Sequence, residues 1–111
     1  MGLRKRLLRE VSAEEAARMV DEGATVLDIR SHREYESGHI PGALHIPVSD
    51  LLKHLPRIPR DRPVVTCNAE DALSATAAEI LTAHGFQAVD GGAWVKLSAL
   101  LKSRRSDEPG R

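Results

Sequence analysis

Two short runs of consecutive apolar residues constrain the fold of this chain most strongly. Residues 25–29 read Thr-Val-Leu-Asp-Ile and residues 64–66 read Val-Val-Thr. Neither run alternates between apolar and polar residues, and such continuous runs are typical of parallel strands that helices cover on both faces. Segments with helical periodicity and loops rich in Gly and Pro surround them. The sequence therefore predicts an α/β domain in which parallel strands alternate with helices.

The other elements follow from local patterns. Ser12 and Glu15 have the spacing of a capping box, and Ser49 is placed to cap a further helix. Gly91-Gly92 predicts a turn. The expected helical segments are residues 12–22, one turn within 31–37, about 50–55, 72–84 and 94–102. Two further short strands are expected at residues 43–46 and 86–89.

Length and composition indicate one domain with an aliphatic core. The chain has 111 residues, of which 41% are apolar and only 3% aromatic. Its formal net charge is zero, which gives no global attraction to nucleic acid or to an acidic membrane. We expect a basic N-terminal segment at 1–10, the domain at 11–102 and a flexible polar tail at 103–111. The basic residues at both ends are interpreted as solvated termini, with a docking patch for an acidic partner as the alternative.

The chain has one cysteine, so it can form no internal disulfide and no cysteine-rich zinc site. A single free thiol fits a reducing compartment. No apolar segment has the length of a secretory signal or of a membrane span, so a cytoplasmic location is expected. His32, His45, His54 and His84 lack the spacing of metal ligands, and neither a metal nor another cofactor is predicted.

The single cysteine, Cys67, follows the strand at 64–66 and precedes the helix expected from Ala72. The first amides of a helix have no intrahelical partner, and the helix dipole is positive there. Both effects lower the pKa of a nearby thiol, whose thiolate is a nucleophile, and the amides can hold an anion. The alternative is a cysteine that is simply buried, as free cysteines often are.

Several motifs resemble the signature of the rhodanese superfamily. They are Asp28-Ile29-Arg30, Glu34-Tyr35, the run GHIPGA at 38–43, VVTC at 64–67, HGF at 84–86 and GG-x-W at 91–94. The resemblance covers roughly residues 11–102. It implies a sheet of about five parallel strands flanked by helices. It also implies sulfurtransferase chemistry, in which the loop cysteine takes sulfane sulfur from thiosulfate or a persulfide and passes it to a thiophilic acceptor such as cyanide, a thiol or a protein.

The resemblance assigns roles to individual residues. Cys67 is the expected nucleophile. The backbone amides of the loop that follows are expected to cradle the sulfur; these belong to Asn68, Ala69, Glu70, Asp71 and Ala72. A second group is expected to form a structural polar network beside the sheet, comprising Asp28, Arg30, Glu34 and His39. His39 is thus not a candidate general base. Trp94 packs either under the loop or against the core.

The loop departs from the family pattern. Active members resemble C-x-x-G-x-R-S, whereas this loop has no Gly and no basic residue, and it contains Glu70 and Asp71. It is one residue longer, unless the extra residue lies in the helix. A carboxylate about 4 Å from the thiolate would oppose it by about 1 kcal/mol in water and ~4 kcal/mol at an effective dielectric constant near 20. Alternatively, Asp71 caps the helix that begins at Ala72.

Two hypotheses follow. The first is a sulfurtransferase or persulfide carrier with weak activity toward thiosulfate, whose donor is a small sulfur-bearing anion or a persulfide and whose acceptor can be a protein. The second is a catalytically degenerate rhodanese-like module that binds or regulates a partner. A third interpretation, a phosphatase or arsenate reductase, is disfavoured, because Leu73 stands where that branch has its anion-binding Arg. The sequence makes no prediction of oligomeric state.

Overall fold

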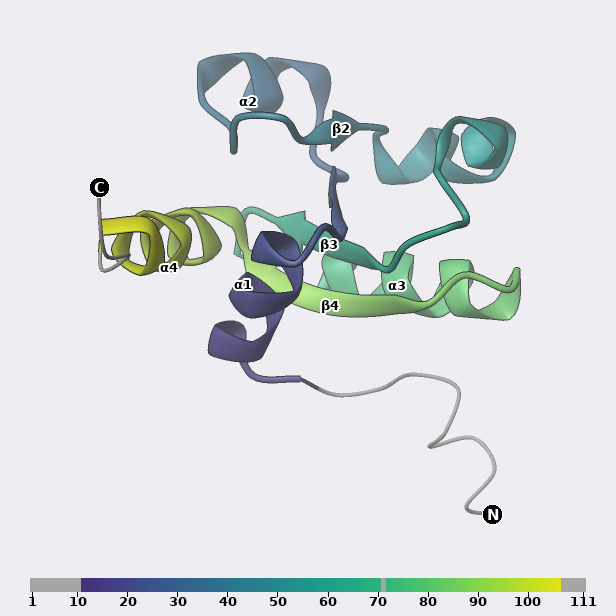
Figure 1. The fold of residues 1–111 in the computed structure, drawn as a ribbon. Coiled ribbons are helices and arrows are strands. Elements are labelled where there is room, and N and C mark those ends of the chain that lie inside the picture. Colours follow the sequence, from purple (N-terminus) through teal and green to yellow (C-terminus); the bar gives the residue numbers. More distant parts are fainter. Residues whose placement is uncertain (1–10, 71, 107–111) are drawn as a thin grey trace.

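Strands and helices alternate along the chain (Figure 1). A computed structural model describes residues 11–70 and 72–106. The elements are α1 (Ala13–Asp21), β1 (Thr25–Asp28), α2 (His32–Ser37), β2 (Leu44–His45), the 3₁₀ helix η2 (Val48–Arg57), β3 (Val64–Asn68), α3 (Leu73–Ala83), β4 (Ala88–Ala93) and α4 (Trp94–Ser106). Each predicted helix and strand has a counterpart in this order, although several boundaries differ.

The strands form one parallel sheet in the order β2-β1-β3-β4, which confirms the α/β class. The resemblance implied about five strands, whereas the described part of the chain has four. These four strands correspond to the four strands that the local apolar patterns predicted. All carboxyl ends of a parallel sheet meet at one edge, and ligands of such sheets bind beyond that edge.

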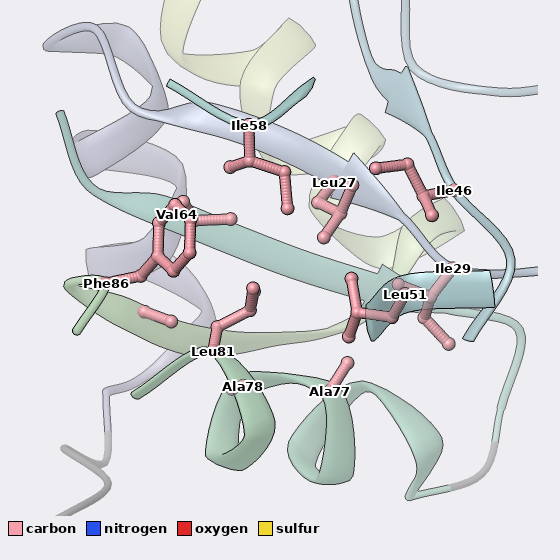
Figure 2. Packing of buried hydrophobic residues seen from close by; sticks show 11 residues of the cluster. Leu27, Ile29, Ile46, Leu51, Ile58, Val64, Ala77, Ala78, Leu81 and Phe86 are labelled. Carbon is pink, nitrogen blue, oxygen red and sulfur yellow. The ribbon is translucent and has the colours of Figure 1, made fainter. Parts of the chain in front are cut away.

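Two apolar clusters cover the two faces of the sheet. One packs α3 and η2 against the sheet, and Figure 2 shows its side chains between the strands and α3, among them Leu27, Val64 and Leu81. The other packs α1 and α4 against the opposite face and includes Ala16, Leu97 and Cys67. Burial on both faces explains why the strand sequences are continuously apolar.

Helix ends follow the sequence signals only in part. The Ser12 hydroxyl accepts a hydrogen bond from the Glu15 amide at 3.0 Å, as the capping-box spacing predicted. The prediction that Ser49 caps the next helix is wrong, because that helix begins at Val48, directly after Pro47, and has no side-chain cap. Pro47 is extended and occupies the N-cap position, so η2 starts two residues earlier than predicted.

The last helix, α4, extends to Ser106, beyond the predicted end at residue 102. Asp21 of α1 accepts hydrogen bonds from Arg104 at 2.6 Å and from Arg105 at 3.3 Å. These ion pairs hold the final turn of α4 against α1, which a helical pattern within α4 could not reveal. Of the predicted terminal segments, residues 1–10 and 107–111 lie outside the described part.

The predicted turn at Gly91-Gly92 is part of β4, at an irregularity in its pairing with β3. A Cβ atom at Gly91 would lie 2.5 Å from Val65 Cγ1 and 2.6 Å from the Thr66 carbonyl oxygen. The glycine therefore serves a close approach between two strands, and Gly92 with φ of +75° redirects the chain. The strand continues because the absent side chain makes room for β3.

Candidate functional site

The sequence placed Cys67 in the turn after the strand, whereas in the structure Cys67 lies within β3. The strand continues to Asn68, and every residue of β3 is buried. Cys67 is paired in register with Asp28 of β1, and its carbonyl accepts a hydrogen bond from the Ile29 amide at 3.2 Å. Its side chain belongs to the apolar cluster beneath α1 and α4 and is 0% exposed.

The surroundings of Cys67 favour the neutral thiol. Burial, followed by the negative charge of Asp28, raises the pKa of Cys67 to about 12, while Arg30 acts in the opposite direction. This direction is opposite to the lowering expected from a helix terminus, and α3 begins only at Leu73, six residues after Cys67. The dipole effect of a helix fades within its first turn. In this conformation the thiol is therefore a poor nucleophile.

The loop after Cys67 has mixed placement. Asn68 is buried at the end of β3, Ala69 is half-buried, and Glu70 and Ala72 are exposed. Asp71, with its predicted roles in the cradle and as a helix cap, lies outside the described residues. Ala72 occupies the N-cap position of α3, where no side chain makes a capping hydrogen bond.

Hydrogen bonds fix the first turn of α3 to the sheet. The Ser74 hydroxyl donates to Asp90 Oδ1 of β4 at 2.6 Å, and Asp90 Oδ1 also accepts from the Gly92 amide at 2.8 Å. The Thr66 hydroxyl of β3 donates to the Ser74 carbonyl at 2.7 Å. Both ends of the loop are therefore attached to the sheet, one through β3 and the other through Ser74.

The four residues expected to form a polar network do not form one connected group. Asp28 and Arg30 make a buried ion pair, with 2.7 Å between Asp28 Oδ2 and Arg30 Nη2. Glu34 accepts hydrogen bonds from the amide and hydroxyl of Ser31, closing a capping box on α2. His39 Nδ1 donates to the Tyr35 carbonyl at 2.8 Å.

Arg30 connects more elements than the other three residues. Its Nη2 donates to the Gly38 carbonyl at 2.6 Å, and its guanidinium lies 4.6 Å from the centre of the Trp94 ring. Trp94 in turn packs against the cluster that contains Cys67. Of the two placements considered for Trp94, the structure therefore supports packing against the core.

His45 contributes to this region in a way that its sequence context did not indicate. Its ring stacks on Tyr35 at 4.3 Å, and His39 stacks on Tyr35 at 3.8 Å. His45 Nε2 also donates to the Arg30 carbonyl at 2.8 Å. No spacing rule predicts this stack, because the three rings come together only when α2 and β2 pack.

A cleft of about 420 Å³ opens beside the carboxyl end of the sheet. Its lining comes from the segment after β1, the start of η2 and the loop before α3: Ile29, Arg30, Ser31, His32, Glu34, Pro47, Val48, Ser49, Asp50, Asn68, Ala69 and Leu73. Asn68 and Ala69 are thus the predicted loop residues that face it. Cys67 does not line the cleft in this conformation.

Within residues 11–70 and 72–106, no three His, Cys, Asp or Glu side chains are grouped so that they could hold a metal ion. No helix in the same part of the chain is long and apolar enough to cross a membrane.

Comparisons with known proteins agree with this geometry. Residues 12–94 match the model of the rhodanese-like domain. The chain is 28% identical over 87 residues to the thiosulfate sulfurtransferase GlpE of Pseudomonas savastanoi, covering 76% of this chain and 82% of that protein. It is 46% identical over 41 residues to the HTH-type transcriptional regulator Rv0324 of Mycobacterium tuberculosis, which is 37% of this chain and 18% of the regulator.

Among solved structures, an NAD-dependent persulfide reductase from A. fulgidus superposes with a TM-score of 0.65 at 28% identity. The match covers 87% of this chain and 17% of the reductase. The chain thus spans less than a fifth of the length of both the reductase and the regulator. The family match, the parallel sheet and the motifs that flank Cys67 show that this chain belongs to the rhodanese-like domain family.

Proposed function

We propose that the chain is a rhodanese-type sulfurtransferase or persulfide carrier with Cys67 as its nucleophile. The observation that carries the proposal is the position of the single cysteine. Cys67 lies near the carboxyl end of β3, opposite Asp28 of the D-x-R motif. The relationship to a thiosulfate sulfurtransferase supports the same chemistry.

The proposed reaction moves one sulfur atom without net oxidation. The Cys67 thiolate attacks the outer sulfur of a donor R–S–SH, and a new S–S bond forms on Cys67. The S–S bond of the donor breaks, and its electron pair leaves with the inner sulfur, which takes a proton to give R–SH. An acceptor nucleophile then attacks the outer sulfur of the Cys67 persulfide and regenerates the Cys67 thiol.

A thiol or protein persulfide is the preferred donor in this proposal, and thiosulfate a weak one. Glu70 is the described charged residue of the loop, and Glu34 and Asp50 line the adjacent cleft together with Arg30, which is paired with Asp28. A free dianion therefore meets more negative than unpaired positive charge. The similarity to a persulfide reductase favours the same donor class. The amides of residues 68–72 would cradle the transferred sulfur once the loop moves away from the buried thiol.

The acceptor would be a thiophilic molecule such as cyanide, a small thiol or the cysteine of a partner protein. A carrier that works through one free thiol needs a reducing environment, and we therefore propose a cytoplasmic location.

The test is sulfur uptake measured by mass spectrometry of the intact protein. After incubation with glutathione persulfide and removal of the donor, we expect one added sulfur atom in the wild type and none in Cys67→Ser. With thiosulfate the labelled fraction should be smaller at equal concentration. Cyanide should remove the added sulfur. If neither glutathione persulfide nor thiosulfate gives an adduct, the proposal is overturned.

A second candidate is a non-catalytic module that binds or regulates a partner. Its specific support is that Cys67 is wholly buried, with a raised pKa, and lies outside the cleft. The partial similarity to a transcriptional regulator agrees with such a role. Restoring the family loop with Glu70→Gly and Leu73→Arg separates the candidates. If the chain is a sulfurtransferase, this double variant takes up more sulfur than the wild type. If it is a non-catalytic module whose site is impaired beyond the loop, sulfur uptake does not increase.

A further inference from the structure

We infer that Arg30 is the cation that stabilises a sulfur anion on Cys67, and that Asp28 is the carboxylate that opposes it. The inference rests on the proposed function and deepens it. It gives the D-x-R pair a role in tuning the thiol, beyond holding the loop against the sheet.

Asp28 and Cys67 are paired positions on neighbouring parallel strands, so their side chains leave the sheet on the same face. Both side chains are 0% exposed, and water therefore screens little of the interaction between them.

The Arg30 side chain folds back over Asp28. Arg30 Nε donates to Asp28 Oδ1 at 2.9 Å, and the Arg30 amide donates to the same oxygen at 3.1 Å. The Gly38 carbonyl and the Trp94 ring hold the other sides of the guanidinium. A Cβ atom at Gly38 would lie 3.2 Å from the Trp94 ring, so a side chain there would press against it. Arg30 is thereby fixed between the cleft, which it lines, and the cluster that contains Cys67.

Of the charged groups in the described residues, Asp28 and Arg30 act on the thiol, and they act in opposite directions. Cys67 shares a buried apolar cluster with residues of α1, α4 and β4, among them Ala16, Leu97 and Val89. The interaction is mutual, because an ionised Cys67 contributes to raising the pKa of Arg30, after the larger effect of the Asp28 hydrogen bond.

The loop after Cys67 contains no basic residue that could stabilise an anion. A persulfide anion on Cys67 needs a positive partner, and residues 68–74 contain no Arg, Lys or His. Arg30 supplies the charge that other family members place in the loop. Burial, and after it Asp28, keeps the resting thiol protonated, and the effect of Asp28 exceeds that of Arg30. The pair therefore comes to favour the anion only when a donor reaches Arg30 through the cleft.

The experiment measures the thiolate of Cys67 directly. Its ultraviolet absorbance is recorded at one alkaline pH at which the native fold persists, and the matching Cys67→Ser background is subtracted to remove Tyr35. Asp28→Asn should increase the thiolate content and Arg30→Gln should decrease it. Arg30→Lys keeps the charge and should stay near the wild type. The ratio of thiolate to thiol changes about tenfold for each unit of pKa.

Opposite changes in Asp28→Asn and Arg30→Gln are the decisive outcome, since both variants break the same ion pair. Changes in the same direction would mean that the pair acts only by holding the structure, and the inference falls. Equal thiolate in Arg30→Lys and Arg30→Gln also overturns it. If circular dichroism shows that Asp28→Asn is unfolded, the two Arg30 variants decide alone.

Sulfur uptake by the same variants separates this inference from the proposed function. Opposite thiolate changes without uptake of sulfur from any donor leave the charge pair standing and remove the sulfurtransferase. Uptake by Cys67 together with thiolate changes in one direction retains the sulfurtransferase and removes the role of Arg30.

Discussion

At the residue scale, Cys67 couples the stability of the fold to pH. Its thiol is buried and its pKa is raised from the ordinary value of 9.0 to about 12. In the unfolded chain the thiol ionises near its ordinary value, whereas the native protein keeps the proton until the pH approaches the raised value. Between the two values the unfolded state binds fewer protons, and stability falls as the pH rises.

We predict that Cys67 steepens the alkaline loss of stability. Between pH 9.0 and about 12, the thiol should remove about 1.4 kcal/mol from the free energy of unfolding for each pH unit. Urea unfolding at several pH values checks this against Cys67→Ala, whose other titrating groups are the same. The variant should show the shallower decline. Parallel curves for the two proteins would show that the native thiol is not held neutral.

At the element scale, the start of α3 is held by the sheet and not by a cap of its own. Ala72 offers no capping side chain, and α3 has no acidic residue in its first turn. The Ser74–Asp90 hydrogen bond instead joins this turn to β4, and the Thr66 hydroxyl joins it to β3. The same contacts attach the distal end of the Cys67 loop.

We predict that Asp90→Ala destabilises the protein by about 1–3 kcal/mol, because it leaves the buried Ser74 hydroxyl without its acceptor. Asp90→Asn retains an oxygen acceptor and should lose less. Urea unfolding of both variants measures the difference. Ser106→Ala, at an exposed hydroxyl that bonds only within α4, is the control and should be nearly neutral. Equal losses in the two Asp90 variants would contradict the assigned hydrogen bond.

At the scale of the whole molecule, the sheet is stabilised from both faces. Leu81 contributes to the cluster under α3, and Leu97 contributes to the cluster under α4. The strands belong to both clusters, since successive residues of a strand point to opposite faces. The two clusters are therefore expected to unfold together.

We predict that Leu97→Ala lowers the free energy of unfolding by about 2–5 kcal/mol through the lost contacts and the remaining cavity. Val95→Ala, at a neighbouring residue that is 61% exposed, should have little effect. Trp94 is the single tryptophan, so its fluorescence reports on the α4 face while far-ultraviolet circular dichroism reports on all elements. The two transitions should coincide in wild type and in Leu97→Ala. Separated transitions would show that the two faces unfold independently.

The sequence predicted most of the fold because its signals are local. The continuous apolar runs at β1 and β3 require burial on both faces, and the Ser12 cap and the α2 turn depend on residues within one turn. The errors in β4 and α4 arose where distant segments decide. The continuation of β4 through Gly91 depends on the approach of Val65, and the last turn of α4 depends on Asp21.

By itself, the sequence determined the α/β class, the rhodanese-like framework and the single cysteine at the carboxyl end of a buried strand. Only the tertiary structure decided the state of that cysteine. The thiol pKa depends on burial beneath α1 and α4 and on the charges of Asp28 and Arg30, which reach Cys67 across the sheet. Solvation and charge are properties of a three-dimensional environment. The residues next to Cys67 in the sequence, including Glu70, therefore could not predict them.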